Sequence, residues 1–511
     1  MKYFSVISPF LYALAFLLIT LQEVSLLVSP IQLFRPLLIL WFLLLLLLYP
    51  AYLFASDWEL AGFLLSVCLF GIAFSARFLK LAGLLLIIVL VVWQVYFRIR
   101  GIKLTFKQFA SLSTMTSIAL VIYSLSLNIL PLAQVPCSKY FQAVERAQSP
   151  PFNSRQSVEQ KPDIYYIVLD GYARADILQE LYGYDNSGFI EHLQEQGFIV
   201  PSQAHSNYAK TVVSVSSTLN LDYQDSFAPG LNDSYYWWLM EPFIDHSAAR
   251  TFLESQGYTT VSVSINWGLT DSLASDVYPR PFPLALSDFE QYLLRISPLS
   301  LLAPAIQDIA SVSTFETHRV TVDAAFRALA DLPSVQGPKF VFVHIVSPHP
   351  PFVFDEVGNP LNPPVGFSFN DANDFYGSSE EYKKGYIAQI QFVNSRVQTA
   401  VDSILAGSIT PPIILIQADH GSGLLTDFSS LDNTCIRERF SPFAAYYLPG
   451  KNLDVIPSNI TPVNLFRIIF NQYFYTDLPL LENRHYYFAD TVFIYQPVDI
   501  ASRIDESCIA P

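Results

Sequence analysis

The sequence predicts a chain of two parts. The first is an α-helical membrane domain of about five transmembrane helices, and the second is an α/β domain with a mainly parallel sheet between helices. Hydrophobic residues make up 52% of the 511 residues and charged residues 14%, with a mean hydropathy of +0.34 that ordinary soluble chains do not reach. The charge is also unevenly divided. Residues 1–136 hold eight Lys or Arg and three Asp or Glu, whereas the remainder holds 21 and 41.

Apolar runs of bilayer-spanning length recur in the first part. They cover residues 7–28, 31–54, 60–76, 81–97 and 115–132. A buried soluble helix is the alternative reading of such a run, but residues 38–48 carry no charge and almost no polar atom. No small-residue cleavage site follows the first run, so we expect it to remain as an anchor rather than to be removed as a signal peptide.

Basic residues in short loops predict the orientation of these helices. The loop between the fourth and fifth runs carries Arg98, Arg100, Lys103 and Lys107, which we expect on the cytoplasmic side. An odd number of helices then places the second part outside the cytoplasm. Lys2 agrees with this orientation, whereas Arg35, Arg77 and Lys80 fall on or near the outer side and oppose it.

The second part begins after a polar, proline-containing linker at residues 136–160, so we expect domains at 1–135 and 161–511. This part is acidic and has no run of Lys and Arg, whereas binding to nucleic acid requires a clustered basic surface. Short apolar runs alternate with helical stretches, a pattern that predicts a parallel sheet. The predicted strands are 164–169, 259–265, 340–346 and 413–417, and the predicted helices lie near 188–196, 315–332 and 382–405.

Carboxylates and imidazoles follow or end several of these runs. Asp170 follows the first run, His344 lies in the third with His349 just beyond it, and Asp419 and His420 follow the last. Reactive groups gather at the carboxyl ends of parallel strands, so these side chains are expected at one edge of the sheet. Carboxylate oxygens with an imidazole suit a divalent ion such as zinc or manganese. Taken singly, each residue is also explained as a turn, a helix cap or a surface pair.

The order of short motifs resembles the sulfatase branch of the alkaline phosphatase superfamily. Asp170-Gly-Tyr-Ala-Arg and the helix after it resemble the opening of that domain, and 207–219 occupies the place of its nucleophile turn, with Thr211 at the nucleophile position. Residues 347–352, 419–421 and 437–450 resemble its His-x-Pro segment, its second metal pair and its closing stretch. The resemblance runs from about 162 to 450 and implies an alkaline-phosphatase-like fold.

Departures from the sulfatase pattern are informative. Sulfatases need a Cys or Ser, followed by Pro and Arg at fixed positions, for conversion to formylglycine. Here Thr211 stands at that position and is followed by Val213 and Val215. Gly171 replaces the second residue of the sulfatase Asp-Asp pair. Together with a multi-helix anchor, these features resemble lipoteichoic acid synthases and lipid A phosphoethanolamine transferases. That resemblance implies a bacterial plasma membrane, an extracytoplasmic catalytic domain and lipid or cell-envelope glycan substrates. Those enzymes commonly have Glu where this chain has Asp170.

The resemblance also implies roles for individual residues. Asp170, Thr211, Asp419 and His420 would hold the divalent ion; Thr211 and His349 would be catalytic; His344, Lys210 and Arg439 would contact the substrate. The expected activity is metal-dependent transfer of a phospho-alcohol group through a phospho-threonine. Hydrolysis of a phosphoester or sulfate ester uses the same residues, and an inactive membrane scaffold or sensor is the alternative of another class. The alternative interpretation of Thr211 is an ordinary helix N-cap without a catalytic role.

Cysteine use leaves the disulfide pairing open. Cys68 lies in a predicted span, while Cys137, Cys435 and Cys508 would lie on the oxidising side of the membrane. Three cysteines allow three pairings, each leaving one thiol over.

Overall fold

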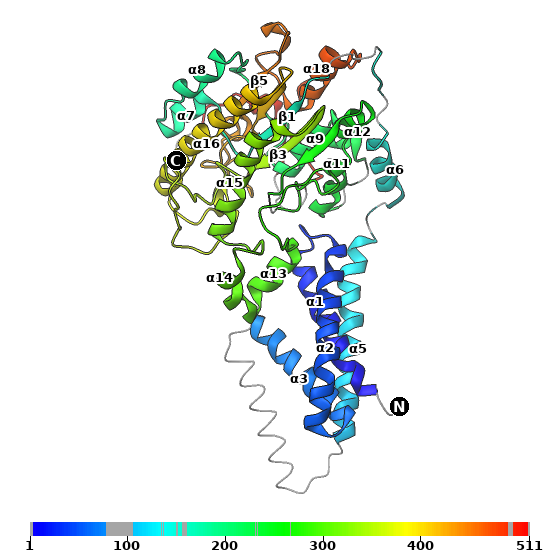
Figure 1. Cartoon of the computed structure of the whole chain (residues 1–511). Coiled ribbons are helices and arrows are strands. Elements are labelled where there is room, and N and C mark those ends of the chain that lie inside the picture. Colours follow the sequence, from blue (N-terminus) through cyan, green and yellow to red (C-terminus); the bar gives the residue numbers. More distant parts are fainter. Residues whose placement is uncertain are drawn as a thin grey trace. The chain divides into compact units, whose positions relative to one another are not determined.

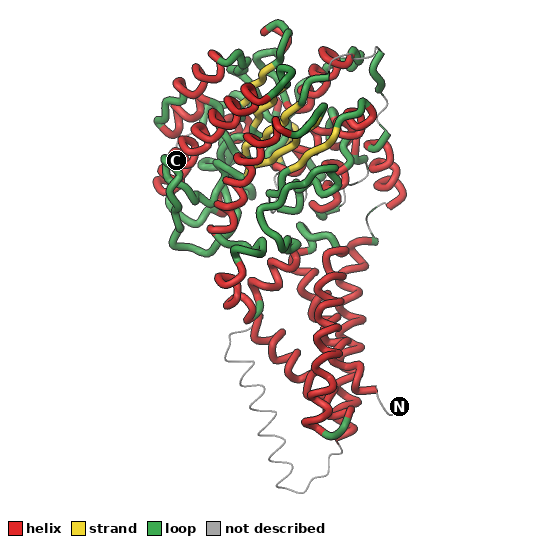
Figure 2. Tube along the Cα trace, viewed as in Figure 1, coloured by secondary structure: helices red, strands yellow, loops and turns green. Residues whose placement is uncertain are grey.

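The computed structural model describes residues 4–77, 106–133, 135, 137–149, 152–155, 161–229, 231, 234–265, 267–488 and 494–508. The chain divides into two compact units (Figures 1 and 2). One, the helical unit, comprises Met1–Gln134 and Leu286–Val312, and the other, the α/β unit, comprises Val135–Ala285 and Ser313–Pro511. The domain limits of 1–135, 136–160 and 161–511 stay a prediction, and residues 137–147 of the expected linker form a helix.

Long apolar helices make up most of the helical unit. They are α1 (Ser8–Val24), α2 (Phe34–Ala55), α3 (Trp58–Arg77) and α5 (Phe106–Leu132), with the short 3-10 helices η1 (Phe4–Ile7) and η2 (Pro30–Leu33). Three spans within the described residues are long and apolar enough to cross a membrane: Ser5–Val24, Pro30–Ala55 and Ala110–Leu132. Trp58–Gly71 is a shorter apolar stretch. The predicted run 81–97 lies outside the described residues.

Polar contacts between the helices define their relative direction. Tyr12 donates to the Ser113 carbonyl oxygen at 3.1 Å, and the Asn128 amide donates to the Leu18 carbonyl oxygen at 3.0 Å, so α1 and α5 run parallel. α2 returns after a short connection, and Trp41 donates to the Phe10 carbonyl oxygen at 3.1 Å. Outward-facing leucines such as those of α2 cost nothing in lipid, which fits the predicted helical membrane domain.

A segment from the second half of the sequence also packs in the helical unit. It contains α13 (Asp288–Ile296), η4 (Pro298–Leu302) and α14 (Ala303–Ile306). Ser287 and Glu290 form a capping box at the start of α13, and the fully buried Phe289 packs among leucines of α1, η2 and α2. The sequence alone did not indicate this association.

The α/β unit is built on a five-stranded sheet of order β2-β3-β1-β4-β5. The strands are β1 (Ile164–Leu169), β2 (Thr259–Ser262), β3 (Lys339–Ile345), β4 (Ile413–Gln417) and β5 (Ala444–Tyr447). β1 pairs in parallel with β3 and β4, β2 pairs in parallel with β3, and β5 is antiparallel to β4. The predicted, mainly parallel sheet is confirmed. β5 was not predicted, because four residues offer too short an alternation to detect.

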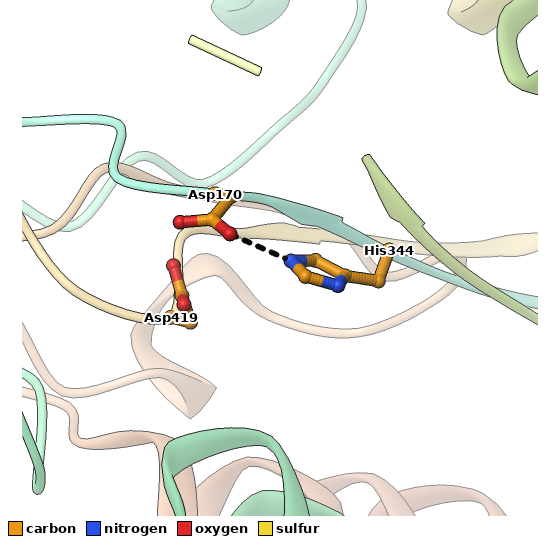
Figure 3. Close-up of side chains that lie close together, drawn as sticks. All are labelled: Asp170, His344 and Asp419. Atoms are coloured by element: carbon orange, nitrogen blue, oxygen red, sulfur yellow. Dashed lines mark ion pairs between the residues drawn. The ribbon is translucent and has the colours of Figure 1, made fainter. Parts of the chain in front are cut away.

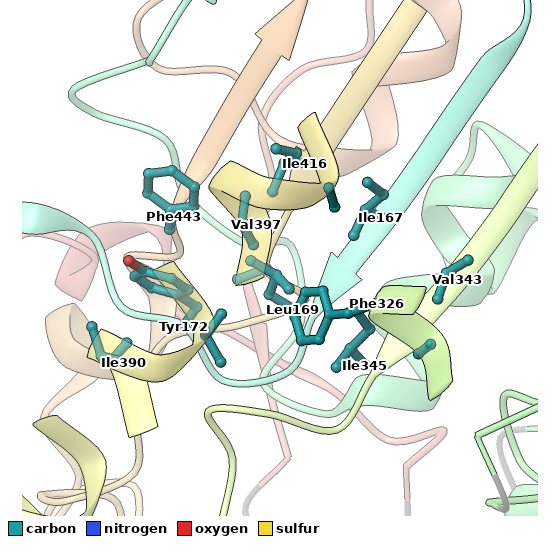
Figure 4. Packing of buried hydrophobic residues seen from close by; sticks show 14 of the residues in the cluster. Ile167, Leu169, Tyr172, Phe326, Val343, Ile345, Ile390, Val397, Ile416 and Phe443 are labelled. Atoms are coloured by element: carbon teal, nitrogen blue, oxygen red, sulfur yellow. The ribbon is translucent and has the colours of Figure 1, made fainter. Parts of the chain in front are cut away.

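Helices cover both faces of this sheet, and the core lies between the layers (Figure 4). Alternate residues of a strand face opposite sides. Tyr165, Ile167 and Leu169 of β1 share a buried cluster with residues of α15 (Phe315–Asp331) and α16 (Ser379–Gly407). On the other side Tyr166 lies edge-on to Phe466 of α18 (Pro462–Phe474), with ring centroids 5.3 Å apart. This packing fixes the strand ends that carry the polar groups described below.

The remaining elements connect and surround these layers. The helices are α6 (Cys137–Ala147), α7 (Ala175–Tyr182), α8 (Ser187–Glu195), α9 (Thr211–Asn220), α10 (Gln224–Phe227), α11 (Glu241–Asp245), α12 (Ala248–Ser255) and α17 (Ile436–Phe440). The 3-10 helices are η3 (Trp237–Met240), η5 (Leu332–Ser334), η6 (Ala372–Asp374), η7 (Leu453–Val455) and η8 (Ala501–Arg503), and β6 (Tyr486–Tyr487) pairs with β7 (Val498–Asp499). Cys435 and Cys508 form a disulfide, and Cys68 and Cys137 are free.

Candidate active site

Polar side chains from three neighbouring strands meet at the carboxyl-terminal edge of the sheet. Asp170 directly follows β1, His344 lies in β3, and Asp419 follows β4 by two residues. Val168 of β1 is in register with both His344 and Gln417, so Asp170 and Asp419 each lie two residues beyond the level of His344. One ligand atom from each lies within 4.8 Å of the others, and all three residues are buried (Figure 3).

Several atoms of this cluster lack a hydrogen bond within the described part of the chain. They are Asp170 Oδ1, Asp419 Oδ2 and His344 Nε2. His344 Nε2 lies 3.2 Å from Asp170 Oδ2, and Thr270 Oγ1 is 2.8 Å from its other ring nitrogen. Buried polar atoms are normally satisfied, so three unsatisfied atoms that converge fit a ligand set for a divalent cation. The residues present therefore suit the predicted metal.

The electrostatic state of the carboxylates agrees with this fit. Burial alone would raise the pKa of Asp170, but the imidazoles of His349 and His344 hold that pKa well below its usual range. Asp419 Oδ1 accepts from the backbone N–H of Gly171 at 3.1 Å and from that of His420 at 3.0 Å. Gly171 has a φ of +70°, a conformation that favours glycine. These contacts leave Asp419 Oδ2 directed at the cluster.

The hydrogen bonds of His420 define its tautomer. Its Nδ1 lies 2.9 Å from the Gly421 carbonyl oxygen, to which it donates, so Nε2 is an acceptor. Arg439 Nη2 donates to this Nε2 at 3.0 Å. Burial lowers the pKa of His420 and Arg439 lowers it further, which keeps the ring neutral. Nε2 also lies 3.2 Å from Asp419 Oδ2 and 3.7 Å from Asp170 Oδ1, so His420 borders the cluster.

Thr211 is the first residue of α9 and faces the same place. Its Oγ1 lies 3.1 Å from His420 Nε2. Ser214, one turn further along, donates to the Asp419 carbonyl oxygen at 2.7 Å and ties α9 to the end of β4. Lys210 is the N-cap residue of α9 but makes no side-chain capping bond there. The structure thus brings Thr211 to the predicted ligands.

Lys210 lies in an aromatic environment beside Thr211. Its Nζ is 3.0 Å from the ring centroid of Phe428 and 5.7 Å from that of Trp237. Burial lowers the pKa of Lys210 well below its ordinary value, and Arg439 adds to this effect. Lys210 was predicted from the sequence, but its aromatic neighbours were not. Trp237 belongs to a run of aromatic residues that also fits ordinary core packing.

Asp371 is a buried residue of this region that the sequence analysis missed. Its carboxylate pairs with Arg439 Nη1 at 2.9 Å, accepts from the Tyr382 hydroxyl at 2.8 Å, and lies 3.8 Å from His349 Nε2. Although burial opposes ionisation, His349 and Arg439 lower the pKa of Asp371 to about 2. Asp371 lies in an irregular loop without apolar periodicity, so no sequence pattern pointed to it.

Glu438 was also missed, and it supports the loop after His420. It is fully buried and accepts hydrogen bonds from the Tyr182 and Ser422 hydroxyls and from the backbone N–H groups of Leu424 and Leu425, at 2.7–2.9 Å. Burial raises its pKa. A Cβ at Gly421 would collide with the Glu438 backbone, so the loop and α17 approach closely only because residue 421 is glycine.

Residues 162–466 match the model of the Sulfatase family, which is more than half of the chain. The chain belongs to the sulfatase family. This confirms the resemblance to the sulfatase branch of the alkaline phosphatase superfamily. Among curated proteins, none matches this sulfatase-family chain.

Solved structures similar to this sulfatase-family chain include the C-terminal periplasmic domain of EcEptC from Escherichia coli, with a TM-score of 0.45, 11% identity and coverage of 70% of this chain and 96% of that one. The soluble domain of lipooligosaccharide phosphoethanolamine transferase A from Neisseria meningitidis has a TM-score of 0.38 and 10% identity, with coverage of 63% of this chain and 90% of that one. The C-terminal periplasmic domain of phosphoethanolamine transferase EptC from Campylobacter jejuni has a TM-score of 0.39 and 11% identity, with coverage of 63% of this chain and 92% of that one.

Proposed function

We propose that this protein is a membrane-anchored, divalent-metal-dependent phosphotransferase that moves a phospho-alcohol group through a phospho-Thr211 intermediate. The observation that carries the proposal is the position of Thr211 Oγ1, 3.1 Å from His420 Nε2 and beside a buried cluster with unsatisfied carboxylate oxygens. An N-cap threonine needs no such neighbours. An inactive scaffold gives no reason to keep these buried atoms unpaired, because each costs about 1–3 kcal/mol.

Asp170, Asp419, His344 and His420 would hold the metal ion with Thr211. Such an ion lowers the pKa of a bound hydroxyl and neutralises charge on phosphoryl oxygens. His344, which the sequence analysis placed at the substrate, is here a ligand because its Nε2 faces Asp170. Two hard oxygens and imidazole nitrogen suit zinc or manganese.

The reaction takes place in two halves. In the first, Thr211 Oγ bonds to phosphorus, its proton leaves to solvent, and the bond from phosphorus to the donor oxygen breaks. His349 Nε2 donates a proton to that leaving oxygen. In the second, an acceptor hydroxyl attacks phosphorus, gives its proton to His349, and the bond from phosphorus to Thr211 Oγ breaks. Thr211 regains a proton from solvent, so both residues return to their starting states.

The two cations have separate roles in this proposal. Lys210 lies beside Thr211 and would contact the phosphoryl oxygens. Arg439 is already paired with Asp371, so it acts as a positioning residue that holds this carboxylate beside His349. Its hydrogen bond to His420 Nε2 would be replaced when that nitrogen holds the ion, because the nitrogen has a single lone pair. A charged Lys210 is costly in its buried aromatic environment until an anion pairs with it, and this favours an anionic group.

Lipid or cell-envelope glycan substrates fit a site tethered to transmembrane helices. We propose a bacterial plasma membrane with the active site on the extracytoplasmic side. Hydrolysis of a phosphoester differs from transfer only in the acceptor, which is then water. Sulfate-ester hydrolysis is disfavoured because Thr211 cannot mature to formylglycine, and turnover of an aryl sulfate by the purified protein would overturn this point.

The test is to capture the intermediate. The detergent-solubilised full-length protein is incubated with a mixed lipid extract and quenched in acid, and the peptide containing Thr211 is analysed by mass spectrometry. A phospho-alcohol adduct on Thr211 supports the transferase. Thr211→Ala abolishes the adduct and lowers turnover by at least about 10³-fold. The matched control is Thr399→Ala, since this exposed threonine of α16 bonds only to its own helix in the described structure.

The other outcomes discriminate among the alternatives. Phosphate alone on Thr211 would identify a phosphatase. A preparation without adduct and without bound metal would contradict the proposal and favour the membrane scaffold.

A further inference from the structure

The inserted segment, residues 286–312, lies between β2 and α15 in the sequence, yet packs in the helical unit. Phe289 is buried among Leu17, Leu21, Leu33 and their neighbours. A bidentate ion pair joins Arg35 to Glu290. These contacts hold the start of the inserted segment on helices that are apolar enough to span a membrane.

All of these contacts lie at one end of the helical unit. α1 and α5 run parallel, and α2 begins beside the end of α1, so Val24, Phe34 and Leu132 mark the same end. The Gln32 side chain accepts from the Phe289 N–H at 3.1 Å, and the Tyr292 hydroxyl donates to Glu23 at 3.2 Å. η4 packs on α3, and Figure 1 shows α13 and α14 at this end of the helices. In a bilayer crossed by these spans, the inserted segment would lie at the level of the headgroups.

The second half of the inserted segment is apolar and faces outward. From Ser297 to Ile309 it carries one charged residue, Asp308. The exposed fractions are 76% for Leu301, 52% for Leu302 and 54% for Ile309. In the same unit, Ile31 of η2 and Phe34 at the start of α2 are also exposed, at 71% and 61%. An exposed apolar surface of this kind is unfavourable in water.

We propose that residues 297–309 form a membrane-interfacial element that inserts Leu301, Leu302 and Ile309 into the lipid bilayer beside the spans. Lipid is the partner that these observations favour, because the exposed leucines belong to the same unit as α2, whose outward-facing side chains are also apolar. Apolar side chains at the headgroup boundary bind in proportion to the area that they bury. The element gives the chain of the catalytic domain a second attachment to the membrane, in addition to the one that follows α5.

Fluorescence quenching in vesicles tests this proposal on the full-length chain. The free thiols are removed as Cys68→Ser and Cys137→Ser, and a single labelled cysteine is introduced as Leu301→Cys or Ile309→Cys. The protein is reconstituted into phosphatidylcholine brominated near the headgroup. We expect emission to fall roughly twofold or more, as for a lipid-facing control probe at Leu38→Cys, one turn from the start of α2. A probe at Ile409→Cys, a fully exposed site of the α/β unit, should keep its emission.

Each other outcome overturns the proposal. Quenching by aqueous iodide but not by brominated lipid would show that the leucines face water. Protection from both quenchers would show that protein covers them, either a second copy or another part of this chain. With the probe at Ile309→Cys, the double variant Leu301→Glu and Leu302→Glu should lose most of the lipid quenching. Unchanged quenching in that variant would mean that the leucines do not anchor the segment.

Discussion

Asp170 and Asp419 present oxygens that lack hydrogen bonds in the described structure, so we expect both to bind the metal. Asp170→Asn or Asp419→Asn should weaken metal affinity by more than about 100-fold, since outer-shell partners alone contribute about 10–100-fold. His344→Ala should have a similar effect if its Nε2 is a ligand. Metal content after equilibration in a competing chelator, measured by mass spectrometry, checks the prediction without any assay of activity.

The matched control for these variants is Asp454→Asn, an exposed carboxylate of the same unit that should retain full metal content. Retention of metal by Asp170→Asn would contradict the proposed ligand set. A variant of His344 that binds metal normally but weakens substrate binding would instead restore the role that the sequence suggested for it.

At the level of residues, sequence reasoning succeeds where chemistry follows a strand. Asp170, Asp419 and His420 were identified because parallel strands end at one edge, and the structure brings them together. The position of His344 Nε2 against Asp170 depends on the register between β1 and β3, which the sequence does not encode in any local pattern. Asp371 and Glu438 act through contacts between distant loops, which no spacing reveals.

The disulfide between Cys435 and Cys508 joins the C-terminal segment to α17 across 73 residues. Closing a loop of that length restricts the unfolded chain, so Cys508→Ala should lower the free energy of unfolding by roughly 2–4 kcal/mol. Cys508 is the better position to change, because Cys435 Sγ also accepts the N–H of Glu438 at 3.3 Å. Thermal unfolding of the solubilised protein checks the prediction, with Cys137→Ser as a control that should leave stability unchanged.

Equal stability of Cys508→Ala and the unchanged protein would show that the disulfide does not stabilise the folded unit relative to the unfolded chain. Peptide mapping without reductant is the direct companion measurement, because it should recover the Cys435 and Cys508 peptides as one linked species.

At the level of elements, uninterrupted apolar runs and long periodic patterns were predicted well, whereas ambiguous patterns were not. The range 413–417 agrees with β4, and α16 extends the predicted helix at both ends. α13 shows why other elements escape detection. Its amphipathic pattern requires an apolar surface to cover Phe289, but the pattern is the same whether a sheet or a bundle of spans supplies that surface.

At the level of the whole molecule, the charge distribution and the disulfide point to the same orientation. Basic residues concentrate in the sequence between the fourth and fifth apolar runs, at Arg98, Arg100, Lys103 and Lys107, and the positive-inside rule predicts that this stretch is cytoplasmic. A disulfide persists in oxidising compartments and is rare in the cytosol, so we expect the unit that contains Cys435 and Cys508 on the opposite side of the membrane.

Labelling of intact cells with a membrane-impermeant maleimide tests this orientation. In a Cys68→Ser background the exposed native Cys137, just beyond α5, should react from outside. With Cys137→Ser and Lys103→Cys, labelling should occur only after the cells are lysed, because Lys103 belongs to the basic loop. The reverse pattern would place the disulfide-bonded unit in the cytoplasm. It would exclude donors and acceptors on the outer surface while leaving the chemistry of Thr211 open to the adduct experiment.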